Sequence, residues 1–212
     1  MGGLNHVNGD IYNSAFYINA QGVCQEYRKI HLVPFGEYMP MRSVVERLND
    51  MAKLVRDIKP GSSYKVFNTP KDTRGLTGKF STIICFESSD SALVGKMVRN
   101  GARMIVVITN DAWFGDTAAI MQHFRITRMR AVEYGIPIIQ AANTGVSGII
   151  GSSGKVILRT GVEKQQLLYG TAAFAAKPSF FARFGYLIIY LYLAFLLVGL
   201  LYRLYYSAQI RQ

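Results

Sequence analysis

Short apolar runs alternate with helix-like stretches through the middle of the chain. Residues 82–84, 104–109 and 136–141 are apolar runs rich in β-branched side chains, which is typical of buried strands. Residues 93–98 and 118–134 carry apolar side chains at helical spacing. Strands that are joined through helices run parallel, so the pattern predicts an α/β sheet. In the second helix, the side chains predicted to point inward are Met121, Phe124, Met129 and Val132.

The N-terminal part of the chain predicts less regular structure. Residues 1–10 are rich in Gly and Asn and are expected to form a loop. Residues 15–18 and 25–30 predict two strands around a turn at 19–22. The second strand leads into residues 32–40, which two prolines and a glycine should hold as a fixed loop. Further short strands are expected at 65–67, 146–150 and 155–158, the last two as a hairpin.

Residues 41–58 predict an amphipathic helix. Its apolar positions recur at three- and four-residue spacing, and its other face carries mainly basic side chains. Two interpretations are open: a surface helix packed on the core, or a helix that lies on a bilayer with its basic face toward lipid head groups.

The tail has a different pattern. Residues 184–202 are nineteen residues without a charge. As a helix they would span about 28 Å, close to the thickness of a bilayer's hydrocarbon core. Arg183 and Arg203 bracket the stretch, and tyrosines lie near both ends, as interfacial anchors do. The sequence therefore predicts a transmembrane helix, with a buried core helix as the alternative, and charge does not decide its orientation.

Charge and cysteine content narrow the classes of function. The formal net charge of +11 indicates either nucleic acid or an anionic membrane surface as a partner. The sequence has no P-loop, zinc-ligand spacing or RNA-binding aromatic motif, so it favours the membrane and predicts no nucleic-acid partner. Two cysteines, Cys24 and Cys85, do not make a disulfide framework. The 212 residues suffice for one domain with a sizeable core.

Cys85 is the candidate nucleophile. It ends the first buried strand and comes just before Ser88, Ser89 and Asp90, which are good helix N-caps. A helix N-terminus favours a thiolate and can stabilise a developing oxyanion. A buried structural cysteine is the alternative. Asn110, Asp111 and Asn143 follow the ends of the next two strands, and ligands of α/β sheets bind at that edge.

A cysteine nucleophile also needs polar partners. His6, His31 and His123 lie in no local catalytic motif and are expected to be structural. Lys29 is the better candidate, because an ammonium near Cys85 would favour the thiolate and counter the charge of a tetrahedral intermediate. Trp113 and Phe114 could line an acyl pocket or simply pack in the core, and Asn110, Asp111 and Asn143 are expected to be hydrogen-bonding rather than reacting groups.

Four segments resemble one family. Residues 29–38 (KIHLVPFGEY), 85–87 (CFE), 110–116 (NDAWFGD) and 143–145 (NTG) are similar to motifs of the apolipoprotein N-acyltransferases, the membrane-bound branch of the nitrilase superfamily. The resemblance covers roughly residues 10–158. It implies an incomplete nitrilase-like αββα sandwich over residues 1–176, whose N-terminal part is missing. It also implies a transmembrane helix with a short tail at 180–206.

The resemblance implies a chemistry as well. Cys85 would take a fatty acyl chain from a phospholipid as a thioester and pass it to the N-terminal amine of a lipoprotein. Lys29 matches the triad lysine, Glu37 a further glutamate that helps hold the site, and Glu87 the acidic residue after the nucleophile. No metal or organic cofactor is implied. The full-length protein would be multi-pass in the bacterial inner membrane, with a periplasmic catalytic domain. Substrate contacts are expected from Asn110, Trp113, Phe114 and Asn143.

The sequence departs from the family pattern in two places. Phe86 stands where the family often has tyrosine. The acidic residues before Lys29 are Asp10 and Glu26, and neither lies in a motif that matches the family's base glutamate. We therefore expect the C-terminal part of a longer enzyme, with little turnover alone. Two alternatives stay open: a nitrilase-type amidase acting on a small amide, and an inactive membrane-anchored fragment.

Overall fold

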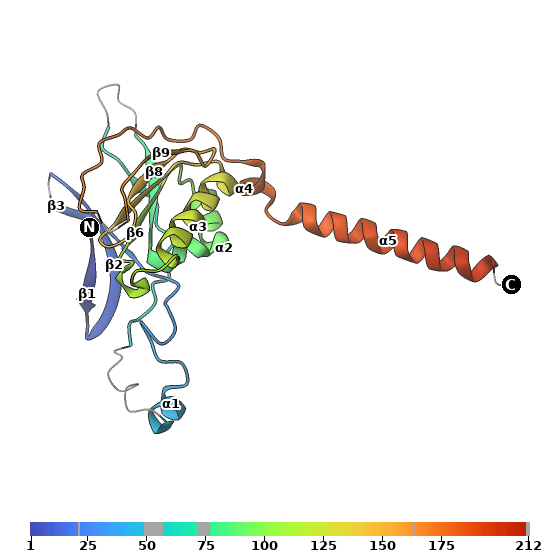
Figure 1. Cartoon of the computed structure of the whole chain (residues 1–212), viewed down its shortest axis with the longest axis horizontal. Coiled ribbons are helices and arrows are strands. Elements are labelled where there is room, and N and C mark those ends of the chain that lie inside the picture. The colour runs from blue at the N-terminus through green and yellow to red at the C-terminus, as the bar shows by residue number, and fades with distance from the viewer. Residues whose placement is uncertain (21, 49–56, 72–76, 163, 211–212) are drawn as a thin grey trace.

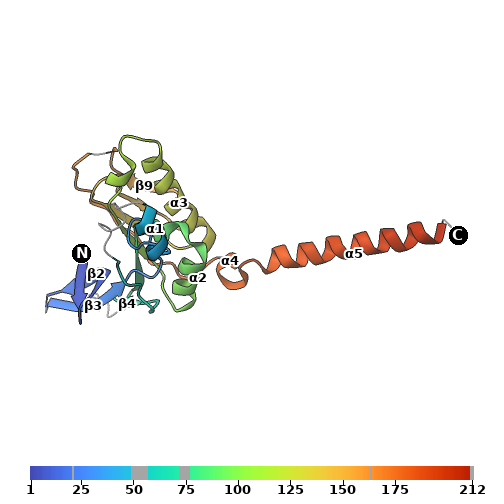
Figure 2. The same ribbon diagram turned by 90° about the horizontal axis from the view of Figure 1, so that it is seen from below.

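The computed structural model describes residues 1–20, 22–48, 57–71, 77–162 and 164–210. The two sheets and the helices that cover one of them form three stacked layers. A three-stranded antiparallel sheet contains β1 (Gly2–Val7), β2 (Asp10–Asn19) and β3 (Gly22–Arg28). A six-stranded sheet forms the middle layer, and the helices α2 and α3 cover its other face (Figures 1 and 2). The predicted α/β class is confirmed.

The six-stranded sheet is parallel at its centre. Its strands follow chain order, and β5, β6 and β7 pair in parallel while every other pair is antiparallel. The helices α2 (Ser91–Arg99) and α3 (Ala119–Tyr134) connect the parallel strands, as crossovers must. The strands are β4 (Phe67–Asn68), β5 (Lys79–Ile84), β6 (Ile105–Thr109), β7 (Ile138–Ala142), β8 (Gly148–Ile150) and β9 (Val156–Arg159). The predicted hairpin of β8 and β9 is confirmed.

Apolar side chains fill both interfaces of the middle sheet. Between the two sheets, the rings of Tyr17, Phe67 and Phe80 lie 5.2 to 5.8 Å apart, centroid to centroid. On the other face, the buried side of α2 packs against the sheet. Asp90 begins this helix by accepting a hydrogen bond from the Leu93 N–H at 2.9 Å, as an N-cap does. The buried apolar side chains of α2 are Leu93, Val94, Met97 and Val98.

The inward face of α3 is only partly the predicted one. Phe124 is buried, but Met129 and Val132 are 53% and 50% exposed. The buried stripe instead follows a continuous helical spacing that carries polar groups into the interior. Its members are Ile120, His123, Phe124, Thr127, Ala131 and Tyr134. Sequence reasoning followed the largest apolar side chains and so chose part of the wrong face.

The predicted loop at residues 1–10 is wrong, because most of it is strand β1. Asn8 and Gly9 form the turn to β2 with φ of 51° and 87°, the left-handed conformation that Asn and Gly tolerate best. The strands predicted at 15–18 and 25–30 lie within β2 and at the end of β3, although β3 stops at Arg28.

The helix predicted at 41–58 is described at its start and at residues 57–58, which are not helical. Helix α1 (Arg42–Leu48) lies away from both sheets (Figure 1), and Val44, one of the apolar positions of the predicted helix, is 52% exposed. Residues 49–56 of the predicted helix lie outside the described residues. The helix is therefore not packed on the core where it is described, and its suggested contact with a bilayer stays a prediction.

The uncharged tail is not one continuous helix. Helix α4 (Phe180–Phe184) ends at Gly185, whose φ is 54°, and α5 begins at Leu187 and extends to Ile210. Helix α5 extends away from the three layers (Figure 1). In the part of the chain that the structure describes, no helix combines the length and apolarity needed to cross a bilayer. The predicted transmembrane helix is therefore not confirmed, and the break at Gly185 removes its first residues from α5.

Candidate active site

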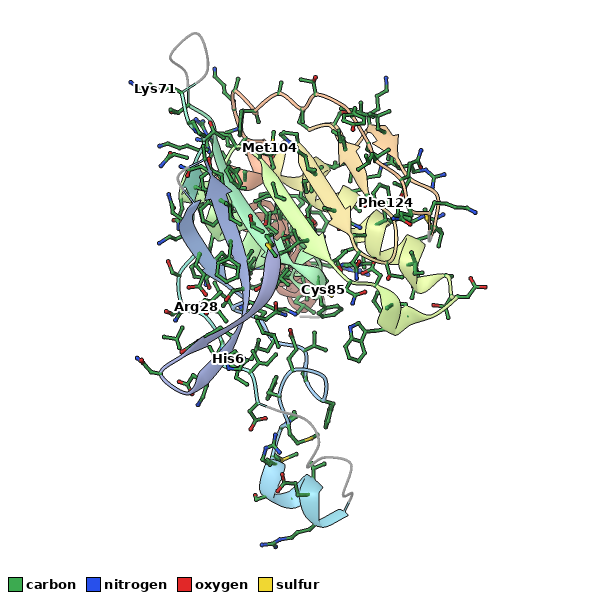
Figure 3. The ribbon with its side chains drawn as sticks, turned by 90° about the vertical axis from the view of Figure 1, so that its left-hand side faces the viewer. His6, Arg28, Lys71, Cys85, Met104 and Phe124 are labelled. Carbon is green, nitrogen blue, oxygen red and sulfur yellow. The ribbon has the colours of Figure 1, made fainter. Side chains whose placement is uncertain are left out.

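Cys85 lies at the carboxyl end of β5, near the loops at the lower edge of the sheet in Figure 3. It is the first residue of a 3₁₀ helix, η2 (Cys85–Ser89), and is partly exposed. Its φ is +53°, which costs a residue with a Cβ atom roughly 1–2 kcal/mol. A strained backbone at a partly exposed cysteine is an arrangement that proteins keep where a side chain must point in one direction.

The Glu87 carboxylate joins two distant segments beneath Cys85. It is 1% exposed. Its Oε1 accepts hydrogen bonds from the Tyr27 hydroxyl at 2.8 Å, the Ile30 N–H at 2.8 Å and the His31 N–H at 3.1 Å. Its Oε2 accepts one from the Ile84 N–H at 2.8 Å. One side chain therefore fixes the end of β5 against the segment that follows β3.

Burial sets the electrostatics of this carboxylate. Burial raises the pKa of Glu87, although the N–H groups of Ile84, His31 and Ile30 and the Tyr27 hydroxyl act to lower it. Burial also raises the pKa of Tyr27, and the neighbouring Glu87 charge adds to this rise. Tyr27 therefore stays a neutral donor to the carboxylate.

Lys29 carries a buried ammonium. Its side chain is 1% exposed, and its Nζ lies 2.6 Å from Glu37 Oε2. The same carboxylate accepts hydrogen bonds from Asn13 Nδ2 at 2.6 Å and the Val33 N–H at 2.8 Å, so its position is fixed as well. An ammonium this buried needs its counter-charge. Lys29 directly precedes Ile30, which Glu87 binds, so the pair lies on the segment that is tied to the Cys85 turn.

The loops at the neighbouring strand ends hold the remaining predicted residues. Asn110 is exposed and accepts a hydrogen bond from the Ala112 N–H at 3.2 Å. Trp113 is 84% exposed, so it does not pack in the core, while Phe114 is half-buried. Asn143 is exposed and lines a polar cleft of about 420 Å³ together with residues 144–145 and 164–166. These side chains lie at one edge of the sheet without contacting the Lys29–Glu37 pair in any hydrogen bond seen among the described residues.

Sequence reasoning missed Tyr27 and underrated two histidines. Tyr27 lies two residues before Lys29 at the end of a strand, a spacing that puts both side chains on one face and could have pointed to it. His31 Nδ1 lies against Asp90 Oδ2, which joins the same segment to the start of α2. His123 lies behind Cys85, with its Nε2 3.2 Å from the Cys85 carbonyl oxygen. Among the residues that the structure describes, no cluster of His, Cys, Asp and Glu side chains could hold a metal ion.

Comparisons with known proteins identify the family of the chain. The family model of the carbon-nitrogen hydrolases matches residues 1–176, and the chain belongs to this family. Within it, the chain resembles enzymes named apolipoprotein N-acyltransferase. It is 38% identical over 174 residues to the one from Geobacter metallireducens, covering 82% of this chain and 32% of that protein. It is 36% identical over 166 residues to the one from Haemophilus ducreyi, covering 77% and 32%.

The chain thus spans about a third of the length of these curated relatives. Two solved structures share its fold. Nit3 of Saccharomyces cerevisiae gives a TM-score of 0.55 at 18% identity and covers 77% of this chain and 55% of its own. A carbon-nitrogen hydrolase from Helicobacter pylori G27 gives a TM-score of 0.60 at 16% identity and covers 81% and 60%. The carbon-nitrogen hydrolase family and the nitrilase-like fold of the chain are therefore established.

Proposed function

We propose that the chain carries the reacting groups of an acyl transfer from a membrane phospholipid to the N-terminal amine of a lipoprotein. The observation that carries the proposal is the buried Lys29 ammonium, 2.6 Å from Glu37, on a segment that Glu87 binds to the Cys85 turn. The names of the curated relatives support the reaction class. The proposed catalytic residues are Cys85, Lys29, Glu37 and Glu87, within a catalytic domain at residues 1–176.

In the first half-reaction, the Cys85 sulfur attacks the carbonyl carbon of a phospholipid ester. The S–C bond forms, the C–O ester bond breaks, and the thiol proton ends on the glycerol oxygen of the departing lysophospholipid. The tetrahedral intermediate carries negative charge on its oxygen, which the Lys29 ammonium would stabilise at short range in a site of low dielectric. Glu37 holds the ammonium in place and Glu87 holds the backbone around the thiol.

In the second half-reaction, the lipoprotein amine attacks the thioester carbon. The N–C bond forms, the S–C bond breaks, and the amine gives up one proton while the thiol regains one. A cysteine nucleophile makes the transfer easier by splitting it into two steps through a covalent intermediate. No step requires a redox group.

An apolar surface next to Cys85 supports a lipid donor. Phe86, the adjacent residue, is 53% exposed, and Trp113 at the neighbouring strand end is 84% exposed. Exposed aromatic side chains beside a reactive group suit an acyl chain or a bilayer surface better than a small amide. We therefore place the working enzyme at the bacterial inner membrane with its domain in the periplasm, and rank the small-amide hydrolase second.

The test is acylation of Cys85. The whole chain is incubated with vesicles of a phospholipid of one acyl composition, and peptide mass spectrometry looks for that acyl mass on Cys85. The adduct should be removed by hydroxylamine, persist in Cys24→Ala and be absent in Cys85→Ala. A single adduct suffices, so slow turnover does not obscure it. Folded protein that gains no acyl mass but releases ammonia from small amides would favour the amidase.

A further inference from the structure

A buried network lies directly behind Cys85 and joins three segments. His123 Nε2, on α3, lies 2.9 Å from Ser88 Oγ and 3.2 Å from the Cys85 carbonyl oxygen. Its Nδ1 lies 2.8 Å from Asp111 Oδ1, and the Thr109 hydroxyl donates to the same oxygen at 2.7 Å. Helix α3 therefore contacts the main chain of the candidate nucleophile through one imidazole ring.

The Ser88, His123 and Asp111 side chains have the spacing of a serine-hydrolase triad, but their burial excludes that role. Ser88 and Asp111 are fully buried and His123 is 3% exposed. A serine that no substrate can reach is not a nucleophile. Within the described part of the chain, the partly exposed reactive residue that this network contacts is Cys85.

Asp111 contacts the His123 ring from a fully buried position. Its N–H donates to the Thr144 carbonyl at 2.9 Å, and its Oδ2 has no hydrogen-bond partner among the residues that the structure describes. A Cβ atom on Gly145, whose φ is +123°, would lie 2.5 Å from that Oδ2. A fully buried carboxylate with one unpartnered oxygen is costly, and proteins keep such a group where it serves a partner. Here the partner in contact is His123.

We propose that His123, with an N–H on each ring nitrogen, is a positioning residue that holds Cys85 in its left-handed conformation by donating from Nε2 to the Cys85 carbonyl, while Asp111 accepts from Nδ1 and orients the ring. Glu87 holds the main chain one residue before Cys85 through the Ile84 N–H. His123 holds the peptide after Cys85 through the Cys85 carbonyl. With the main chain held on both sides, the strained φ of +53° persists and the thiol keeps one direction. The proposal rests on the proposed function only in assigning Cys85 the role of nucleophile.

Two substitutions separate the two ends of the ring. The side-chain nitrogen of asparagine overlays the Nδ1 position, so His123→Asn keeps a donor to Asp111 and loses the contact with Cys85. The amide of glutamine reaches the Nε2 position, so His123→Gln keeps a donor to the Cys85 carbonyl and loses that to Asp111. Both variants remove the ring and its packing, so a merely structural role would be damaged alike in the two.

The experiment measures how fast iodoacetamide alkylates Cys85 in the whole chain. The thiolate displaces iodide, and peptide mass spectrometry separates Cys85 from Cys24. We expect His123→Asn to slow the reaction about tenfold, roughly the effect of one lost hydrogen bond on a barrier, and His123→Gln to stay within about twofold of wild type. Gln122→Asn, an exposed neighbour on the same helix, serves as the matched control. Thermal unfolding of each variant shows that it is folded.

Equal rates in the two His123 variants, whether fast or slow, would overturn the proposal. If either variant does not fold, Ser88→Ala replaces it, because it removes the other Nε2 partner and leaves the Cys85 carbonyl. Its rate should stay within about twofold of wild type, whereas a tenfold loss would mean that Ser88 and not Cys85 is the partner that matters. Alkylation needs no phospholipid, so a failed acylation test and a failed positioning test are distinguishable.

Discussion

The three-stranded outer sheet and the turn at Cys85 each contain a residue with a positive φ and a carboxylate that accepts several hydrogen bonds, but the two carboxylates differ in burial. In the outer sheet, Asn8 takes a φ of +51° and the Glu26 carboxylate collects hydrogen bonds from three side chains. At the turn, Cys85 takes a φ of +53° and the Glu87 carboxylate collects three backbone N–H groups and a tyrosine hydroxyl. The Arg28–Glu26 ion pair is partly exposed, whereas Glu87 is enclosed.

Burial reverses the electrostatic outcome. Burial acts to raise the pKa of Glu26, but the hydrogen bonds from Arg28, Ser14 and Asn5 outweigh it, and the pKa is lowered. Burial raises the pKa of Glu87 in spite of its four donors. Glu26 therefore belongs to an ion pair near the surface of the outer sheet. Burying Glu87 costs free energy, and its hydrogen bonds join the end of β5 to the segment that follows β3.

The largest expected effect is that of removing each carboxylate. Glu87→Ala leaves buried N–H groups without acceptors and should lower the free energy of unfolding by about 3–5 kcal/mol. Glu26→Ala removes a partly exposed ion pair and the acceptor of the buried Ser14 hydroxyl, and should cost less, about 1–2 kcal/mol. Urea unfolding of the two variants and wild type measures both values. Similar losses in the two would contradict the distinction between the regions.

Local sequence patterns predicted the six-stranded sheet and its helices better than the three-stranded sheet. The strands β5 to β7 and the helices between them follow from hydrophobic periodicity, which is a local property. Strand β1 did not, because its Gly and Asn residues have low strand propensity and it exists through pairing with β2. The break at Gly185 was missed for another reason: the prediction followed the absence of charge, although glycine is the residue that most readily takes a positive φ at the end of a helix.

For the proposed site, the sequence predicts a set of residues and not their arrangement. Motifs pointed to Lys29, Glu37, Cys85 and Glu87. The partners of Glu87 lie 56 to 60 positions away in the sequence, apart from one, so no local pattern could reveal them. The backbone strain at Cys85 could not be predicted either, because cysteine does not favour a positive φ.

A second, smaller effect is the pH dependence of stability, which should have opposite signs in the two regions. The native pKa of Glu87 is raised, so its contribution is fully present below the unfolded pKa and is lost as pH rises toward the native value. The native pKa of Glu26 is lowered, so its contribution is present above the unfolded pKa and is lost as pH falls through the native value.

Glu87→Gln and Glu26→Gln isolate these two contributions. Their unfolding free energies are compared with wild type between about pH 4 and pH 8, a range that brackets the usual glutamate pKa. The advantage of wild type over Glu87→Gln should shrink as pH rises, and its advantage over Glu26→Gln should grow. Slopes of the same sign would show that hydrogen bonds and not burial govern Glu87.

The smallest expected effect concerns the two left-handed residues. Asparagine tolerates a positive φ, so Asn8→Gly should change stability by no more than about 0.5 kcal/mol. Cysteine does not, and glycine removes the steric cost of its Cβ atom. We therefore expect Cys85→Gly to be more stable than Cys85→Ala by about 1 kcal/mol, the net of relieved strain and the greater freedom of glycine in the unfolded chain. Urea unfolding of the two Cys85 variants measures the difference without any substrate. An alanine variant as stable as the glycine variant would mean that the turn relaxes once sulfur is gone, and that its geometry is not imposed by the segments around it.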